Sequence, residues 1–188
     1  MQAFYDQAAS LPALHNVLLT NLIILFILPT DKVGFNDSED NMGTVKAVCT
    51  SKYKGTQKTA AKYIDLIEDL DIDGDAHAGK WHRQVSLLSY EKIEEFKKRG
   101  IELDDGAFGE NIIIEGYDLK ALPLGTRFKI GDVCLELTQI GKECHAHCAI
   151  YHAVGDCIMP REGVFTKVLK GGRVTAGDTV ELILPAGS

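Results

Sequence analysis

Thiol and imidazole side chains gather in one short stretch of this 188-residue chain. The stretch runs from Ile140 to Phe165 and contains Cys144, His145, His147, Cys148, His152 and Cys157. Such groups can bind a metal, act as nucleophiles when the thiol is ionised, or pack in a core. Three interpretations are therefore open, a metal site, a reactive thiol and a buried strand, and the spacing and neighbours of these residues distinguish among them.

The zinc interpretation depends on Cys144 and Cys148, which are spaced as C-x3-C. Structural zinc sites usually take paired ligands from two separated segments, and no second C-x2-C or H-x3-H pair lies elsewhere in the chain. The pattern therefore offers only one half of such a site.

A reactive thiol fits the stretch better. A cysteine acts as a nucleophile or soft-metal ligand in its thiolate form, which a nearby cation favours, and Lys142 and Arg161 are available. Successive strand residues point to opposite faces, so a strand cannot direct residues 144, 145, 147 and 148 to one point. We therefore expect a loop after a strand ending at Ile140. Cys49 and Cys134, each alone in a strand pattern, are expected in the core.

A second candidate segment, 71–82, reads DIDGDAHAGKWH. Its alternating acids resemble a calcium-binding loop, but Ala76 stands where glycine is needed and His82 where a bidentate glutamate is needed. Two interpretations remain open. The acids form a solvated turn, or His77, His82 and Arg83 surround an anionic ligand.

Composition narrows the classes of function. A net charge of −7 argues against nucleic acid as a partner, because that binding needs clustered cations. Five cysteines without framework-like spacing favour a reducing compartment, which predicts a cytoplasmic protein. Residues 1–41 carry five acids and one base, a net −4, so residues 42–188 keep a net charge of −3.

Residues 1–41 form an apolar extension that fits no targeting class. The run from Leu11 to Leu28 is uncharged, and its densest part, Val17 to Leu28, is about as long as the apolar part of a signal peptide and shorter than the roughly 20 apolar residues that cross a bilayer. The only charge before it is Asp6, where a signal peptide is basic, and no small-residue cleavage site follows it. We expect translation to start at Met42, with a membrane-associated segment or a packed helix as alternatives, and we expect no membrane partner.

The rest of the chain predicts mainly β structure. Strands are expected over 43–51 and 84–89, and a short helix is expected to begin the segment 58–79. Ser89 is a suitable N-cap for a helix over 90–99, before Gly100. Two Gly-Asp pairs, at 131–132 and 177–178, predict two hairpins, and together they favour a closed antiparallel barrel.

Several blocks, in order, resemble one family. DGDAHAG, HRQVSLLSYE, FGENI, LPLGTRFKIGD, TQIGKECH and MPREGVFTKVLKGGRVTAGDTVEL resemble the MOSC domain, found at the C-terminus of molybdenum cofactor sulfurases and as small stand-alone bacterial proteins. The resemblance implies a mainly β fold, a closed MOSC-like β-barrel with a few short helices, over residues 42–186. Residues 1–41 lie outside it.

The resemblance also implies a single functional cysteine, which carries sulfur as a persulfide or coordinates molybdenum of a bound pterin cofactor. It falls on Cys144 or Cys148, and Cys157 is a third candidate as a resolving thiol. The pterin phosphate or acceptor would be held by His77, His82, Arg83, Asn111, Lys142 and Arg161. Full sulfurases have a pyridoxal-phosphate domain that is not in this chain, so a separate donor such as a cysteine desulfurase must supply the sulfur.

These implications favour a sulfur carrier that delivers to a molybdenum-pterin or metal–sulfur centre, in cofactor biosynthesis or in a molybdoenzyme. One alternative is a molybdenum-cofactor-dependent reductase of N-hydroxylated compounds. The other is a non-catalytic zinc or interaction module. Fold and family alone do not choose among them.

Overall fold

The computed structural model describes residues 42–144 and 149–187. The predictions for residues 1–41, and those for His145, His147 and Cys148, lie outside these residues. The elements are β1 (Gly43–Thr50), β2 (Thr59–Ala61), β3 (Tyr63–Ile67), β4 (Asp71–Ile72), β5 (Val85–Ser89), α1 (Tyr90–Lys97), β6 (Ile112–Glu115), the 3-10 helix η2 (Leu119–Ala121), β7 (Arg127–Ile130), β8 (Val133–Ile140), α2 (Ala149–Val154), α3 (Met159–Glu162), β9 (Val164–Lys170), β10 (Gly172–Thr175) and β11 (Thr179–Ile183).

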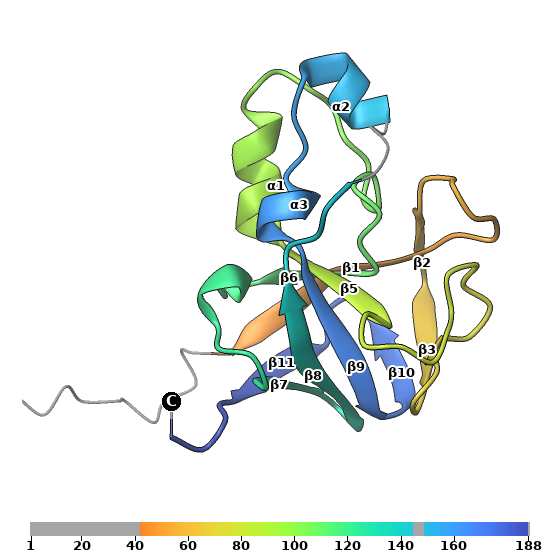
Figure 1. Cartoon of the computed structure of the whole chain (residues 1–188), viewed down its shortest axis with the longest axis vertical. Coiled ribbons are helices and arrows are strands. Elements are labelled where there is room, and N and C mark those ends of the chain that lie inside the picture. Colours follow the sequence, from red (N-terminus) through yellow and green to blue (C-terminus); the bar gives the residue numbers. More distant parts are fainter. Residues whose placement is uncertain (1–41, 145–148, 188) are drawn as a thin grey trace, which may run out of the picture. The chain divides into compact units, whose positions relative to one another are not determined.

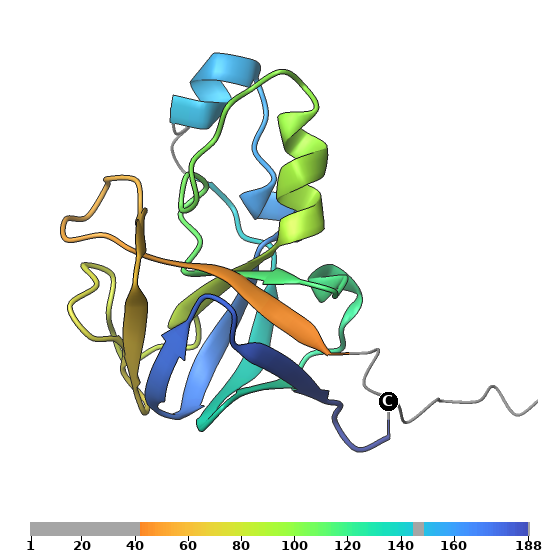
Figure 2. The same ribbon diagram turned by 180° about the vertical axis from the view of Figure 1, so that it is seen from behind.

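Seven strands close into a barrel, in the order β1-β11-β7-β8-β9-β5-β6 and back to β1 (Figures 1 and 2). A ring with an odd number of strands cannot alternate direction throughout, so at least one neighbouring pair must be parallel. That pair is β5 and β6, and α1 lies in the crossover that parallel strands require. The prediction of a mainly β, closed barrel with a few short helices is confirmed.

Alternating side chains fill the barrel. In β8, Val133, Leu135 and Leu137 are buried in the interior, and the residues between them are only partly covered. The second sheet, β10-β3-β4, adds Ile64 and Val174 to the same core. At about 25 cal/mol per Å² of buried apolar surface, this core is the dominant stabilising contribution of the fold.

A second core lies between the barrel and the helices. Ile93 and Phe96 of α1 are buried there with Leu88 and Ile113 of the barrel wall, and Phe96 meets Phe108 edge to face with ring centroids 5.2 Å apart. The predicted helix is confirmed. Ser89 is at its N-cap position, but its hydroxyl donates to Glu91 at 2.6 Å and accepts no hydrogen bond from a backbone N–H of the helix, so it is not a side-chain cap.

Three predictions were wrong. Cys134, which was expected in the core, is only partly buried, because it alternates with the interior residues Val133 and Leu135 of β8. The expected short helix after residue 58 is instead the strand pair β2 and β3, because β2 adds to the edge of β1 and Ile64 and Leu66 alternate into the core. The pair Gly177-Asp178 does not close a hairpin. β10 pairs with β3 while β11 pairs with β7 and β1, and the turn bonds to β1 through Val45. Gly131-Asp132 does join the antiparallel strands β7 and β8, as predicted.

No helix among the described residues combines the length and the apolar character that crossing a membrane demands.

Candidate functional site

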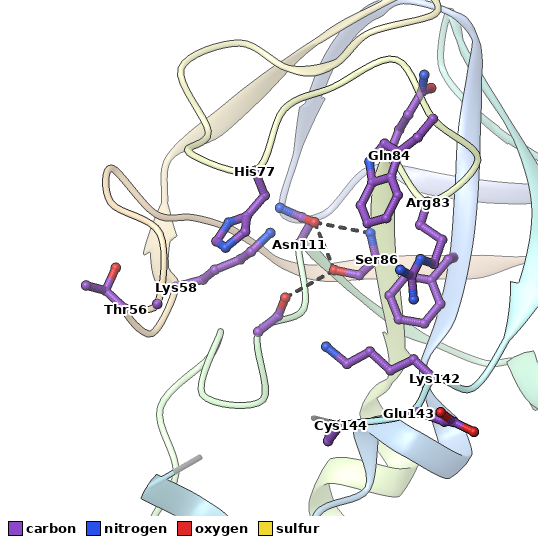
Figure 3. Close-up of a pocket in the computed structure, with 14 residues that line it drawn as sticks. Thr56, Lys58, His77, Arg83, Gln84, Ser86, Asn111, Lys142, Glu143 and Cys144 are labelled. Atoms are coloured by element: carbon purple, nitrogen blue, oxygen red, sulfur yellow. Dashed lines mark hydrogen bonds between the residues drawn. The ribbon is translucent and has the colours of Figure 1, made fainter. Parts of the chain in front are cut away.

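A cavity of about 410 Å³ opens where four loops meet the barrel wall (Figure 3). Its lining residues are Gly55, Thr56, Lys58, His77, Trp81, Arg83, Gln84, Ser86, Gly109, Asn111, Lys142, Glu143, Cys144 and Phe165. Five of the residues predicted for the site, His77, Arg83, Asn111, Lys142 and Cys144, are thus brought together from segments far apart in the chain. Lys58 and His77 lie at one end and Cys144 at the other, with Lys142 between them.

Cys144 reaches the cavity on the loop that leaves β8 after Ile140, as predicted. Gly141 has φ +70°, and a Cβ there would lie 2.5 Å from the carbonyl oxygen of Pro160, so only glycine allows the loop to pass so close to α3. The Gly141 N–H donates to the carbonyl of Gly163 at 2.7 Å. The loop is therefore tied to the end of α3, and the side chain of Cys144 is exposed.

The middle of the cavity carries positive charge. The guanidinium of Arg83 lies 4.5 Å from the ring centroid of Trp81 and 5.7 Å from that of Phe165. The ammonium of Lys142 lies 5.8 Å from the ring of Phe165. Neither cation has a salt-bridge partner among the described residues, and the buried Nε of Arg83 has no hydrogen-bond partner there either. Such an arrangement suits an anionic ligand.

Asp75 organises the other end of the cavity. Its carboxylate is 1% exposed and accepts from the backbone N–H groups of Ser51 (3.1 Å) and His77 (2.9 Å), while the Lys58 ammonium lies 3.4 Å away. Burial alone would raise the pKa of Asp75, but the His77 N–H and the Lys58 charge outweigh it and the pKa is lowered. Burial lowers the pKa of Lys58, and the neighbouring acids oppose that effect.

This burial was not expected. The sequence suggested either a solvated turn or an anion site, and no local pattern marks Asp75 or Asp71 as buried. Asp71 is 2% exposed, and burial raises its pKa to about 7. The backbone N–H of His77 and the tertiary position of Lys58 on the neighbouring loop together explain why the pKa of Asp75 is lowered despite its burial.

His77 is oriented by the same carboxylate. Its Nδ1 lies 3.2 Å from Oδ1 of Asp75 and 3.4 Å from the hydroxyl of Ser51. A carboxylate at Nδ1 favours a proton on that nitrogen, which leaves Nε2 to exchange a proton or a hydrogen bond with a ligand. The imidazole is 43% exposed, so a ligand in the cavity can reach it.

Asn111 acts as a support. Its Oδ1 accepts from the backbone N–H (3.1 Å) and hydroxyl (2.8 Å) of Ser86, and its Nδ2 donates to the carbonyl of Cys49 at 3.2 Å. With both ends of the amide engaged, Asn111 is placed to position Ser86 and the cavity floor, and its capacity for a ligand is small.

Other predicted site residues lie elsewhere. Nε2 of His82 lies 2.9 Å from Oε1 of Gln139. Arg161 donates to Asp156 from both terminal nitrogens, at 2.7 and 3.1 Å, beside a separate, smaller hollow between α1 and α3. Cys157 is buried in the second core. Of the two predicted metal ligands only Cys144 is among the described residues, which contain no cluster of three or more His, Cys, Asp or Glu side chains able to hold a metal.

The sequence reasoning missed Lys58, Trp81, Ser86 and Phe165 as parts of the cavity. Trp81 and Ser86 lie beside residues that were singled out, so proximity in the chain was a usable signal. Lys58 and Phe165 carry no such signal, because their positions depend on how β2 and β9 lie in the sheet.

The model of the MOSC domain matches residues 74–181, more than half of the chain. The chain belongs to the MOSC domain family. This family is linked to binding of the molybdenum cofactor or to sulfur transfer. The match includes His77, Arg83, Asn111, Lys142 and Cys144.

Solved structures support the same fold for this MOSC protein. YuaD from Bacillus subtilis superposes with a TM-score of 0.63 and 19% identity, covering 75% of this chain and 95% of that one. YiiM from Escherichia coli gives 0.55 and 18%, covering 78% and 72%, and YiiM from Geobacillus stearothermophilus gives 0.58 and 18%, covering 75% of each. At these identities the likeness concerns the fold alone. No curated protein sequence matches the chain.

Proposed function

We propose that this MOSC protein is a sulfur carrier. Cys144 accepts sulfur as a persulfide from a separate donor and passes it to an anionic molybdenum-pterin acceptor in the cavity. The observation that carries the proposal is the exposed thiol of Cys144 in the same cavity as Arg83 and Lys142, two cations that no described acid neutralises.

Loading the thiol needs only thiolate–disulfide-type chemistry. The thiolate of Cys144 attacks the outer sulfur of a donor persulfide, R–S–SH. The donor S–S bond breaks, a new S–S bond forms on Cys144, and the donor leaves as the thiolate R–S⁻, so no net oxidation occurs. Delivery as sulfide requires two electrons. A second thiolate supplies them by attacking the inner sulfur of the Cys144 persulfide, so that the S–S bond to the outer sulfur breaks, HS⁻ leaves, and a disulfide between that thiol and Cys144 forms.

The residues present fit a pterin phosphate. The guanidinium of Arg83 lies against the rings of Trp81 and Phe165 and offers several donors to a phosphate, its Nε having no partner among the described residues, and Lys142 adds a second positive charge. As acceptor, the cofactor would supply a soft metal to which sulfide binds well. The chain's own contribution is to hold that anion and to keep the charged persulfide stabilised by nearby cations.

The sulfur source is a second protein in this proposal. A cysteine desulfurase is the appropriate class, and the acceptor belongs to cofactor biosynthesis or to a molybdoenzyme. Cys49, Cys134 and Cys144 form no disulfide with any described residue, and a thiol carrier works in a reducing compartment such as the cytoplasm.

A reductase of N-hydroxylated compounds is the second candidate. Loading of sulfur on Cys144 does not require the Asp75–His77 pair at the opposite end of the cavity. Cleavage of an N–O bond with loss of water consumes protons, and His77, oriented by Asp75, is placed to donate one. In this alternative the cofactor would stay bound, and Cys144 would be the residue that holds its metal.

Intact mass spectrometry tests the carrier proposal. The protein is incubated anaerobically with a cysteine desulfurase and cysteine, beside the variants Cys144→Ala, Cys148→Ala and Cys157→Ala. We expect a gain of one sulfur atom that a reductant removes and that only Cys144→Ala abolishes. No gain in any form, together with a pterin and molybdenum that co-purify in equal amounts with the protein, would favour the reductase.

A further inference from the structure

Cations without an acid partner are unevenly distributed over this protein. Nineteen lysines and arginines are described, and twelve of them form salt bridges; the paired set is Lys46, Lys58, Lys92, Lys97, Arg99, Lys120, Arg127, Lys129, Arg161, Lys167, Lys170 and Arg173. The seven described cations without a carboxylate at salt-bridge distance are Lys52, Lys54, Lys62, Lys80, Arg83, Lys98 and Lys142.

Four of these seven line the cavity or adjoin a residue that lines it, and a fifth lies on one of the same loops. Arg83 and Lys142 line it, Lys54 adjoins the lining residue Gly55, and Lys80 adjoins the lining residue Trp81. Lys52 lies on the same loop as Lys54, between β1 and β2. This loop and the loop between β4 and β5, which carries Lys80, lie on the same side of the barrel in Figures 1 and 2. The excess of positive charge is therefore local, since residues 42–188 carry a net charge of −3.

Exposed aromatic rings lie among the lysines. The side chains of Tyr53 and Trp81 are 72% and 43% exposed, unusual values for large rings. We use the name lysine rim for Lys52, Tyr53, Lys54, Lys80 and Trp81. Exposed aromatics beside cations are typical of protein-binding surfaces, where rings supply contact area and charges supply steering.

The two loops of the lysine rim are held together. The Ala76 N–H donates to the carbonyl of Ser51 at 2.8 Å, and the Ser51 N–H donates to Asp75 at 3.1 Å. The hydroxyl of Thr56 closes the turn by donating to the carbonyl of Tyr53 at 2.7 Å. Fixed loops lose little entropy on binding, so this surface is prepared for a partner.

We propose that the lysine rim docks an acidic segment of the protein that brings the persulfide to Cys144. The proposal rests on the carrier function above and names the charge of the donor. Glu143, which lines the cavity, and Asp104 and Asp105, which precede the lining residue Gly109, are exposed but lie outside the two loops of the rim. The buried Asp75 is paired with Lys58, so the rim presents unpaired positive charge on this one side of the cavity and orients the donor. Nucleic acid is disfavoured because the patch is small and the rest of the domain is acidic.

Sulfur transfer from the docked donor follows the same chemistry as loading. The donor's S–S bond breaks, the outer sulfur bonds to Cys144, and the donor leaves as a thiolate. The lysine rim takes no part in these bonds. Its role is to raise the rate of productive encounter, which electrostatic steering increases by about tenfold or more at low salt and which salt suppresses.

Two persulfide-loaded peptides test the proposal, one with the central cysteine flanked by aspartate and glutamate and one flanked by serine and glycine. The rate of sulfur gain on Cys144 is measured by mass spectrometry. In wild type at 50 mM NaCl we expect the acidic peptide to load at least about fivefold faster than the neutral one, and the two rates to converge at 500 mM NaCl. Equal rates at low salt would overturn the proposal.

A matched pair of variants isolates the surface. Lys52→Glu/Lys54→Glu should remove the preference for the acidic peptide and leave loading from the neutral peptide unchanged. Lys62→Glu/Lys98→Glu makes the same change in net charge at the two unpaired lysines outside the rim, and it should keep most of the preference. Equal loss in both variants would show a general charge effect and refute docking at the rim.

Two further outcomes separate this proposal from its alternatives. Failure of both peptides to load wild type, at any salt concentration, would refute the carrier function itself. Binding of a labelled oligothymidylate at 150 mM NaCl that is lost in Lys52→Glu/Lys54→Glu would overturn the protein partner and assign the rim to nucleic acid.

Discussion

The Asp75–Lys58 ion pair provides a quantitative test of how the cavity is built. Both side chains are nearly buried, at 1% and 7% exposed, and their charged atoms lie 3.4 Å apart. Removal of one partner of a buried pair leaves an uncompensated charge, at a cost of about 3–5 kcal/mol. Asp75→Asn keeps the size of the side chain but cannot accept from Ser51, His77 and Lys58 together. We expect the variant to lose about 3–5 kcal/mol of unfolding free energy.

A double-mutant cycle isolates the pair itself. Lys58→Met keeps a long chain and removes the ammonium, so Asp75 still accepts from the two backbone N–H groups. In Asp75→Asn/Lys58→Met neither charge is left unpaired, and we expect the double variant to be more stable than the sum of the single losses by about 1.5–3 kcal/mol. The loss in each single variant includes the burial of the remaining partner, which the double variant avoids.

The assay is urea unfolding at pH 7.5 followed by tryptophan fluorescence, with circular dichroism as a second probe. Trp81 is the only tryptophan and lies on the cavity wall, so agreement of the two probes shows that unfolding is cooperative. Additivity of the two substitutions within about 0.5 kcal/mol would refute the idea that this pair couples the loops.

Three further predictions concern single residues. The raised pKa of Asp71, about 7 against an ordinary 3.8, means that the unfolded chain releases this proton near pH 4 while the folded chain retains it, so stability falls as pH rises from about 4 to 7. Asp71→Asn should remove that fall. Between pH 4 and pH 8 the unfolding free energy of wild type, measured with urea, should drop by up to about 4 kcal/mol more than that of the variant, and an equal drop in both proteins would contradict the prediction. Cys157→Ala should lose about 1–2 kcal/mol because the thiol is buried, yet iodoacetamide should still label Cys144 at the wild-type rate. Arg83→Gln should weaken binding of inorganic phosphate at least about tenfold by calorimetry with little change in Tm, and equal affinity would exclude Arg83 as an anion ligand.

The barrel was predictable because its signals are local. Alternation in β8, the Gly131-Asp132 turn and the apolar face of α1 each occur within about ten residues, and each predicts an element that the structure contains. Pairing partners are not local. The turn at Gly177 resembles a hairpin turn, but hydrogen bonds to Val45 on β1 direct β10 and β11 into different sheets.

The candidate site divides in the same way. Cys144 and Arg83 could be proposed from the sequence because a thiol and a guanidinium have characteristic chemistry wherever they lie in the fold. Whether a charge is free or paired is decided in three dimensions, and no sequence pattern distinguishes Arg83, which faces a cavity, from Arg161, which is held by Asp156. No sequence pattern predicts that Lys58 lies in the site, although its charge offsets part of the cost of burying the Asp75 carboxylate.

The two ends of the cavity are anchored independently, and this separation has a chemical consequence. Cys144 depends on the contact of Gly141 with the end of α3, whereas His77 depends on Asp75 and the loop after β1. The barrel wall between them is rigid because its side chains are closely packed. A change at Asp75 should therefore alter stability and the orientation of His77 without altering access to the Cys144 thiol. A function that needs only sulfur loading would survive that change, and one that needs a proton from His77 would not.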